Sequence, residues 1–463
     1  MTPRCEHTAL NFSVSAAAQK VGYSRATLQQ RVSATIATVL RKRKVVPDNS
    51  FPAPLVLPGD DLFLDPGHPA QGLRSWLREE DRNEVTPQRN VIYVAAPPAV
   101  DTDFEFLHSW TEPQNNEARA ATIPIPCTQD VMEYLAAFYH GLPVRSLPSK
   151  LCFAPWDSPT KKPSKSKATI PRYIAINSET ESVRIRTRRS KDGIYTAQLN
   201  LDDLLDAAIS ILPDDAYALL LIVHHDLYES ADDEFVCGRA YGGSRVAVIS
   251  SARYHPILDG THNVERQHAW PASHCAAYMD ACCKASDDAP NRPKKRAKLH
   301  ASDVDASSSS LLRNDIQSPM HAALNAHISL SESLVSSTSG STLLWLTRLC
   351  RTASHELGHC FGMDHCVYYA CSMQGSASLV EDARQPPYLC PVDLAKLLYA
   401  VTRHIHDDTA IATGIDESTL GAASEARYRA LLSFCDARAK GHLFAAYGAW
   451  IRARLAQDFP PPL

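Results

Sequence analysis

TASHELGHCFGMDH, residues 352–365 of this 463-residue chain, contains the pattern HExxHxxGxxH in full. Residues four positions apart share one face of a helix, so His355 and His359 can present two imidazoles to one ion. Glu356 lies beside them, where its carboxylate can act on a metal-bound water. The stretch therefore predicts an active-site helix that carries a hydrolytic zinc centre.

The end of this helix is predicted at Gly362, because glycine adopts without penalty the left-handed conformation in which many helices end. The turn can bring His365 back toward the ion as a third ligand. Three imidazoles leave a fourth position for water, and zinc lowers the pKa of that water so that hydroxide forms near neutral pH. We expect one catalytic zinc ion held by His355, His359 and His365, with Glu356 as the general base.

Thiol side chains crowd together after the third histidine. Cys366 follows it directly, Cys371 comes shortly after, and Cys390 begins the run CPVD that ends at Asp393. Thiolates are common ligands of structural zinc, and a carboxylate oxygen can complete a site of three thiolates. Cys360 is an alternative fourth ligand. The other interpretation is that these cysteines are free thiols that pack as small apolar residues.

These features resemble the archaemetzincins, a family of zinc metallopeptidases in the metzincin clan, over residues 91–400. In that family the third histidine leads into a cysteine, a second cysteine, a methionine turn and a CxxC pair that binds a second zinc. The resemblance implies that Met373 forms the tight turn beneath the catalytic histidines. It also implies a structural zinc ion held by Cys366, Cys371 and Cys390. Asp393 departs from the family, because it stands where the second cysteine of the pair belongs.

Further segments look like the core of the same family, namely residues 226–228, 235–240 and 246–250, and Arg253. In metzincins the strand before the active-site helix is an edge strand that pairs with extended substrate. Residues 246–250 are therefore a candidate for binding peptide by strand addition. The alternative is that this strand only packs in the core.

Apolar runs of strand length predict a sheet. Three of them, at 91–96, 216–223 and 246–250, are separated by segments of helical spacing that include 128–141 and 201–212. We therefore expect an α/β (α+β) fold with a metzincin-like mixed sheet and an active-site helix. The C-terminal part shows helical spacing without strand signals, so it should be mainly helical.

Changes in composition divide the chain into three predicted parts. Residues 1–90 form an N-terminal extension that is partly helical, because residues 16–44 show helical spacing before a Pro-rich stretch. Residues 91–400 form a catalytic domain. It contains a predicted disordered insertion at 284–338, whose charged and Ser-rich sequence cannot bury enough apolar surface to fold. Residues 401–463 form a helical C-terminal segment.

The composition is typical of a soluble globular protein, with 44% apolar residues, 21% charged residues and a formal net charge of -4. The N-terminal sequence lacks the apolar core of a signal peptide, and no stretch approaches the roughly 20 apolar residues that span a bilayer. Thirteen cysteines, an odd number, favour metal ligation over a disulfide framework. We expect an intracellular protein, in the cytoplasm, the nucleus or both, without a membrane partner.

A basic run, RPKKRAK, extends from Arg292 to Lys298 within the predicted insertion. Such a run in an accessible segment predicts binding to a nuclear import receptor. The alternative is an ordinary solvated charge run.

The sequence as a whole predicts a zinc metallopeptidase that cleaves peptide or protein substrates with a zinc-activated water. Glu356 removes a proton from this water and passes it to the leaving amine. The alternative from another class is a zinc-stabilised scaffold or binding protein with little or no peptidase activity. Specific nucleic-acid binding is not expected, because base-reading and stacking elements are missing.

Overall fold

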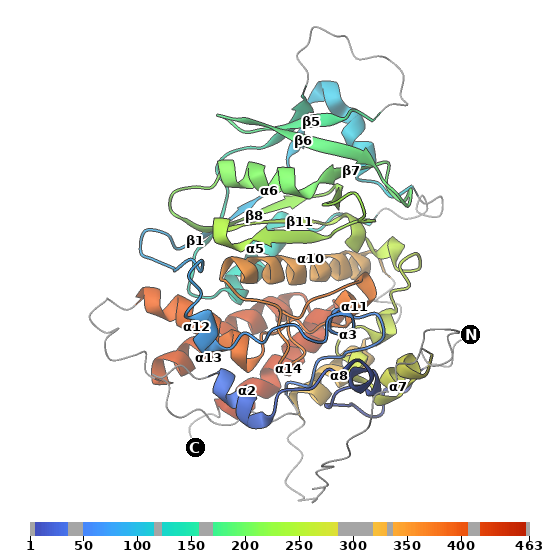
Figure 1. Cartoon of the computed structure of the whole chain (residues 1–463), viewed down its shortest axis with the longest axis vertical. Coiled ribbons are helices and arrows are strands. Elements are labelled where there is room, and N and C mark those ends of the chain that lie inside the picture. The colour runs from blue at the N-terminus through green and yellow to red at the C-terminus, as the bar shows by residue number, and fades with distance from the viewer. Residues whose placement is uncertain are drawn as a thin grey trace, which may run out of the picture.

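The chain is arranged in stacked layers of sheet and helix. The computed structural model describes residues 5–35, 50–114, 123–156, 170–285, 318–330, 337–405 and 417–459. Figure 1 shows one sheet at the top, a second sheet below it, a long helix beneath that sheet, and the C-terminal helices under the long helix.

The central sheet contains five strands in the order β10-β11-β8-β1-β3. Their bounds are β1 Val91–Ala95, β3 Val144–Ser146, β8 Ala216–Val223, β10 Gly238–Tyr241 and β11 Val246–Ser250. Four strands run parallel, and β10 pairs antiparallel with β11. Strands β1, β8 and β11 are buried along their whole lengths, which explains their continuous apolar sequences. The sheet is therefore mixed, as predicted.

The two edges of this sheet are β10 and β3, and β11 is an interior strand. Strand β11 pairs with β8 on one side and with β10 on the other. The prediction that residues 246–250 form a substrate-binding edge is therefore wrong, and packing in the core was the correct interpretation. The short sequence GRAY of β10 has no apolar run, so its strand character could not be seen in the sequence.

The second sheet has six strands in the order β2-β4-β5-β6-β7-β9. Their bounds are β2 Ala99–Val100, β4 Cys152–Pro155, β5 Tyr173–Asn177, β6 Ser182–Arg189, β7 Ala197–Asn200 and β9 Asp226–Tyr228. Helix α6, Leu201–Ser210, lies between the two sheets (Figure 1). Its apolar face shares one hydrophobic core with both sheets. The second sheet and α6 therefore cover one face of the central sheet.

The opposite face of the central sheet is covered by α10, Thr338–Cys360, and α5, Thr128–Phe138. The side chain of Ser337 caps α10 by accepting a hydrogen bond from the Gly340 amide at 3.0 Å. The last three turns of α10 are almost entirely buried, because the helix has a sheet above it and other helices below. A buried helix of this kind is a rigid support for side chains at its C-terminal end.

The C-terminal part is helical, as predicted. It consists of α12 Pro391–Ile405, α13 Glu417–Ala437 and α14 His442–Asp458. Helix α14 packs against α8, Pro319–Ser329. The prediction of a disordered insertion over 284–338 is wrong for α8, where Ser318 caps a helix with Pro319 in its first turn.

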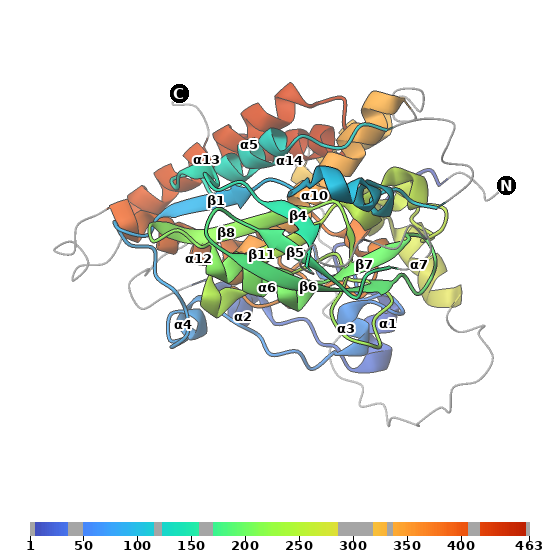
Figure 2. The same cartoon turned by 90° about the horizontal axis from the view of Figure 1, so that it is seen from above.

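The described residues of the N-terminal extension, 5–35 and 50–90, contain four short helices: α1 Ala16–Val21, α2 Leu28–Ala34, α3 Asp61–Leu64 and α4 Leu73–Trp76. Seen from above, they lie along one side of the molecule, opposite α13 and α14 (Figure 2). Gly22 ends α1 in a left-handed conformation with φ +84°, so residues 16–35 form two helices and not one. The basic run Arg292 to Lys298 lies outside the described residues.

The remaining helices are short connectors. They are α7 Ala276–Ala285, α11 Leu379–Arg384, η1 Thr102–Trp110, η3 Gly242–Ser244, η4 Ala252–Tyr254, η5 Pro256–Leu258, η6 Arg266–His268 and η7 Ala272–His274. Within the part of the chain that the structure describes, no helix combines the length and apolarity needed to cross a bilayer.

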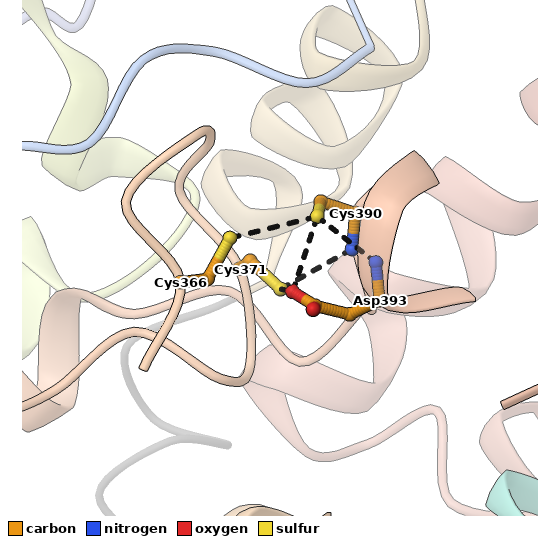
Figure 3. A group of neighbouring side chains, drawn as sticks. All are labelled: Cys366, Cys371, Cys390 and Asp393. Carbon is orange, nitrogen blue, oxygen red and sulfur yellow. Dashed lines mark hydrogen bonds between the residues drawn. The ribbon is translucent and has the colours of Figure 1, made fainter. Parts of the chain in front are cut away.

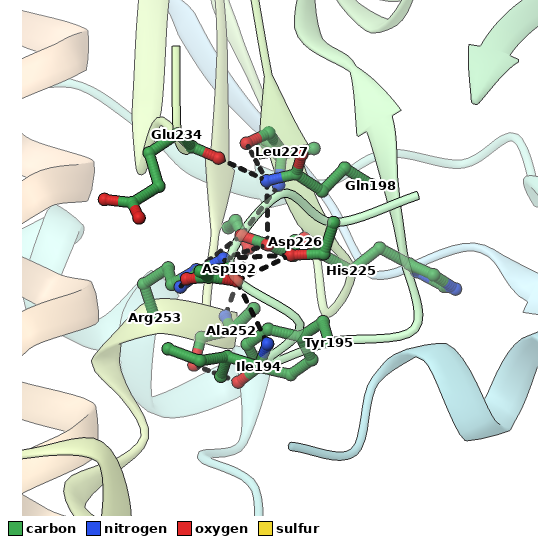
Figure 4. Close-up of polar contacts among 12 residues, drawn as sticks. Asp192, Ile194, Tyr195, Gln198, His225, Asp226, Leu227, Glu234, Ala252 and Arg253 are labelled. Atoms are coloured by element: carbon green, nitrogen blue, oxygen red, sulfur yellow. Dashed lines mark hydrogen bonds and ion pairs between the residues drawn. The ribbon is translucent and has the colours of Figure 1, made fainter. Parts of the chain in front are cut away.

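A buried ion-pair network ties the two sheets together (Figure 4). The guanidinium of Arg253, which follows β11, is fully buried and donates from Nε to Asp226 Oδ1 at 2.8 Å. It also pairs with Asp192, which follows β6. Gln198 on β7 donates to Asp226 Oδ2 at 2.9 Å. Each buried charge thus has a partner, which offsets the high cost of removing it from water.

Replacing Asp226 with Ala leaves the Arg253 guanidinium buried with one carboxylate partner fewer. We expect the free energy of unfolding to fall by about 3 kcal/mol or more, because an uncompensated buried charge is costly. Urea unfolding followed by circular dichroism measures this change. The control is Glu425→Ala, which removes the partner of the exposed Arg429 and should cost under about 1 kcal/mol. Equal losses in the two variants would contradict the role given to the network.

Candidate metal centre

The last turns of α10 carry two histidines on one face. Nδ1 of His355 lies 2.8 Å from the Ser372 carbonyl oxygen, and Nδ1 of His359 lies 2.8 Å from the Met363 carbonyl oxygen. A carbonyl oxygen only accepts hydrogen bonds, so each Nδ1 carries a proton. In the neutral rings, each Nε2 therefore holds a lone pair.

These two lone pairs face each other. The Nε2 atoms of His355 and His359 are 3.1 Å apart. Neither nitrogen has a proton to share, so the contact is repulsive unless a cation lies between them. The ring of His365 completes the group, with its centroid 5.3 Å from that of His355 and 5.1 Å from that of His359. Three imidazoles that converge in this way fit a zinc ion.

Burial keeps the three histidines neutral. Loss of water around the ring lowers the pKa of His359 to about 4, and the nearby His365 contributes to the same shift. The pKa of His355 lies well below its ordinary value for the same reason. A neutral imidazole is the form that binds metal, so the site needs no deprotonation step near neutral pH.

The turn after α10 brings His365 close to His355 and His359. Helix α10 ends at Cys360, and Gly362 has φ +73°, a conformation that a side chain would disfavour. The amide of Met363 donates to the Gly358 carbonyl at 3.1 Å, which closes the turn. Gln71 holds the turn from outside, donating to the Gly362 carbonyl at 3.0 Å.

Met373 lies directly under the helix. A side chain at Gly358 would collide with the sulfur of Met373, so the absence of a Cβ allows this close packing. The Cys366 amide donates to the Met373 carbonyl at 2.8 Å. The methionine is fully buried and therefore forms a fixed floor below the histidines.

Glu356 points into the same cleft as the histidines. The cleft has a volume of about 890 Å³ and is bordered by α10, by β10 and by the loop before α11. Burial raises the pKa of Glu356 to about 8, against the opposing effect of the Arg239 charge. A carboxyl group with a pKa near neutrality can both take up and release a proton.

Asp61, in the N-terminal extension, lies beside His365, and the sequence did not indicate this contact. Oδ2 of Asp61 lies 4.0 Å from Nδ1 of His365. Glu381 supports Asp61 by accepting a hydrogen bond from its amide at 2.9 Å. These contacts join positions about 300 residues apart, so no local sequence pattern could have indicated them.

The three cysteines predicted to bind a second zinc come together with Asp393 (Figure 3). Sγ of Cys366 and Sγ of Cys390 are 3.6 Å apart. Oδ2 of Asp393 lies 3.2 Å from Sγ of Cys390 and 3.3 Å from Sγ of Cys371. All four side chains are buried. Cys360, the alternative fourth ligand, is not part of this cluster.

A lysine compensates charge at this second cluster. Nζ of Lys396 lies 2.8 Å from Oδ1 of Asp393, so Oδ2 remains directed at the thiols. Lys396 also donates to Oε1 of Gln71 at 2.8 Å, and the same oxygen accepts from the Asp364 amide at 3.0 Å. Gln71 thereby connects the cysteine cluster to the turn that carries His365.

Several known proteins are similar in sequence to this chain. Residues 326–430 match the model of Peptidase family M54. Archaemetzincin-2 of Homo sapiens is 28% identical over 213 residues, which cover 46% of this chain and 45% of that protein. Archaemetzincin-2 of Rattus norvegicus is 41% identical over 81 residues, covering 17% and 23%. The chain thus spans about half the length, or less, of these curated relatives.

A solved structure of a related protein is also similar. The archaemetzincin of Methanopyrus kandleri is 16% identical, with a TM-score of 0.29 and coverage of 69% of this chain and 97% of that chain.

Gly375 is the residue that lets Asp61 and His365 approach each other. A Cβ at this position would collide with the Asp61 carboxylate and lie 2.7 Å from Nδ1 of His365. We expect Gly375→Ala to weaken zinc binding by about 10–100-fold, because the third histidine and its carboxylate partner are displaced. Competition with a chromophoric chelator measures this affinity.

The matched control is Gly243→Ala in the same cleft, where an added Cβ meets nothing within 4 Å. It should bind zinc like the unchanged protein. Equal zinc affinity in both alanine variants would show that the contact between Asp61 and His365 has no influence on the metal.

Proposed function

We propose that this chain, which belongs to the archaemetzincin family, is a zinc metallopeptidase that hydrolyses peptide bonds of peptide or protein substrates. One observation carries the proposal: the lone pairs of His355 and His359 converge at 3.1 Å beside Glu356, in an open cleft. A scaffold protein would need neither a carboxyl group at this position nor a cleft above the histidines.

The metal ligands are His355, His359 and His365. When bound, zinc supplies a Lewis acid that polarises the scissile carbonyl and lowers the pKa of water. The carbonyls of Ser372 and Met363 keep the first two rings in the tautomer that binds metal. Asp61 is a positioning residue for the third ring.

Glu356 is the general base. It takes a proton from the attacking water and then delivers that proton to the leaving amine. Burial raises the pKa of the carboxyl, so the proton that it has taken up is held until it can be delivered. The backbone at Gly238 lies close to Glu356. A Cβ added to Gly238 would be 3.4 Å from Cγ of Glu356. The strand that contains Gly238 therefore borders the reacting bond.

The substrate binds as an extended strand. Strand β10 has β11 on one side and no strand on the other among the described residues, and its first residues border the cleft. Main-chain hydrogen bonds to such an edge bind a peptide independently of its side chains. The side chain of Arg239 borders the same cleft and is paired with Glu229.

Cys366, Cys371, Cys390 and Asp393 would hold a second zinc ion with a structural role. Three thiols and one carboxylate are ligand types of structural zinc, and the buried charge of Lys396 would offset part of their negative charge. Because Cys366 directly follows His365, this ion fixes the segment that carries the third catalytic ligand.

Replacing Glu356 with Gln tests the reaction directly. The amide retains the shape of the side chain but cannot take up a proton, so kcat/KM should fall by about 10²–10⁴-fold or more while zinc content is unchanged. The assay digests an unbiased peptide mixture with zinc-loaded protein and identifies the products by mass spectrometry. Cleavage by the Gln variant at the unchanged rate would sink the mechanism, and no cleavage by either protein would favour a scaffold.

Replacing Cys371 with Ser tests the second zinc ion. The variant should lose about one zinc ion per chain and melt at a lower temperature, since a structural zinc contributes directly to folding. Metal analysis and thermal unfolding measure the two effects. Cys360→Ser is the control, because Cys360 is buried but lies outside the cluster. Unchanged zinc content in Cys371→Ser would mean that these cysteines are only packed thiols.

A further inference from the structure

A third group of metal-binding side chains lies where the start of the chain meets the segment before α7. Cys5 and His7 come from the N-terminal arm, and His268 comes from η6. The arm is held beside residue 275 by main-chain contacts: Leu10 pairs with Cys275, and the Asn11 amide donates to the His274 carbonyl at 2.8 Å. None of these residues belongs to the two centres described above.

The ligand atoms of this group are close enough to share one ion. One atom from each of Cys5, His7 and His268 lies within 4.8 Å of the others. Sγ of Cys5 is also 3.5 Å from Sγ of Cys275. Two thiolates bound to tetrahedral zinc at about 2.3 Å are about 3.8 Å apart, so the observed sulfur separation is close to that of a shared ion.

The ring of His268 is held in a fixed orientation by its neighbours. Its side chain is only 7% exposed, and its ring stacks on Tyr278 with centroids 3.9 Å apart. Nδ1 lies 2.7 Å from Oε2 of Glu265, so Nδ1 donates its proton to that carboxylate. This leaves a lone pair on Nε2. A carboxylate behind a histidine is the usual second contact of a metal-bound imidazole.

The lone pair of His268 has nothing to bind among the described residues. Nε2 of His268 is fully buried and makes no hydrogen bond. Nδ1 of His7 is also buried and also makes no hydrogen bond. A buried polar atom without a hydrogen-bond partner destabilises the folded protein. Burial and the nearby His268 lower the pKa of His7, which favours its neutral, metal-binding form. Two buried imidazole nitrogens without partners, beside the Cys5 thiol, need a common ligand.

We propose that Cys5, His7 and His268 bind one further zinc ion, which clamps the N-terminal arm onto the body of the protein. One thiolate and two imidazoles are ligands that zinc prefers, and the Cys275 thiol, 3.5 Å from Sγ of Cys5, is a candidate for the fourth position.

A disulfide between Cys5 and Cys275 is the competing interpretation of the short sulfur separation. It would use both thiols but leave the buried nitrogens of His7 and His268 without partners. A metal ion satisfies both nitrogens as well as the Cys5 thiol, and for this reason the geometry favours it.

Metal analysis of the full-length, zinc-loaded protein tests the proposal. We expect His268→Ala to contain about one zinc ion per chain less than the unchanged protein. The matched control is His321→Ala, which removes an exposed histidine of α8 outside the three groups and should keep the full zinc content. The same zinc content in His268→Ala and in the control would overturn the proposal.

Thiol labelling of the unchanged protein tests the site without any substitution. Cys5 is partly exposed, and Cys127 is exposed and serves as an internal standard. We expect iodoacetamide to label Cys127 at once and to label Cys5 only after a chelator is added. Rapid labelling of Cys5 without chelator would overturn the proposal. Labelling of Cys5 that requires a reductant, and does not follow from adding the chelator, would also overturn the proposal, because it would identify a disulfide.

Discussion

The two imidazole nitrogens that face each other at 3.1 Å are the constraint on which the rest of the structure depends. Carbonyl oxygens fix the protons of His355 and His359 on the far side of each ring, so the near sides carry only lone pairs. While both rings are neutral, the protein alone cannot remove this repulsion without giving up those hydrogen bonds. A cation removes it, and the surrounding layers hold the rings in place to receive one.

The supporting contacts come from parts of the chain that are far apart in sequence. The central sheet and the C-terminal helices bury α10 from both sides, and Met373 closes the floor beneath it. Gln71 reaches the turn after α10 as well as Lys396 in the cysteine cluster. The three histidines and the cysteine cluster are therefore connected through Gln71, and a change at either group should affect the other through this side chain.

The sequence predicted those features that depend on local spacing. The positions of His355 and His359 follow from helical geometry, and the buried strands β1, β8 and β11 follow from apolar runs. Strand β10 could not be predicted, because four residues of mixed character form a strand only through pairing with β11. Helix α8 was missed because the Ser-rich sequence before it dominated the composition of the segment. The contact of Asp61 with His365, and the group around His268, depend on the tertiary fold alone.

Anomalous diffraction at the zinc edge, from crystals of the purified protein, tests the central claim most directly. A zinc peak should lie about 2.0–2.1 Å from Nε2 of each of His355, His359 and His365. The contradicting result is the absence of a peak, together with a ring of His355 or His359 turned so that a proton lies between the two nitrogens. That result would show that the histidines satisfy each other and that the site is not built for a metal.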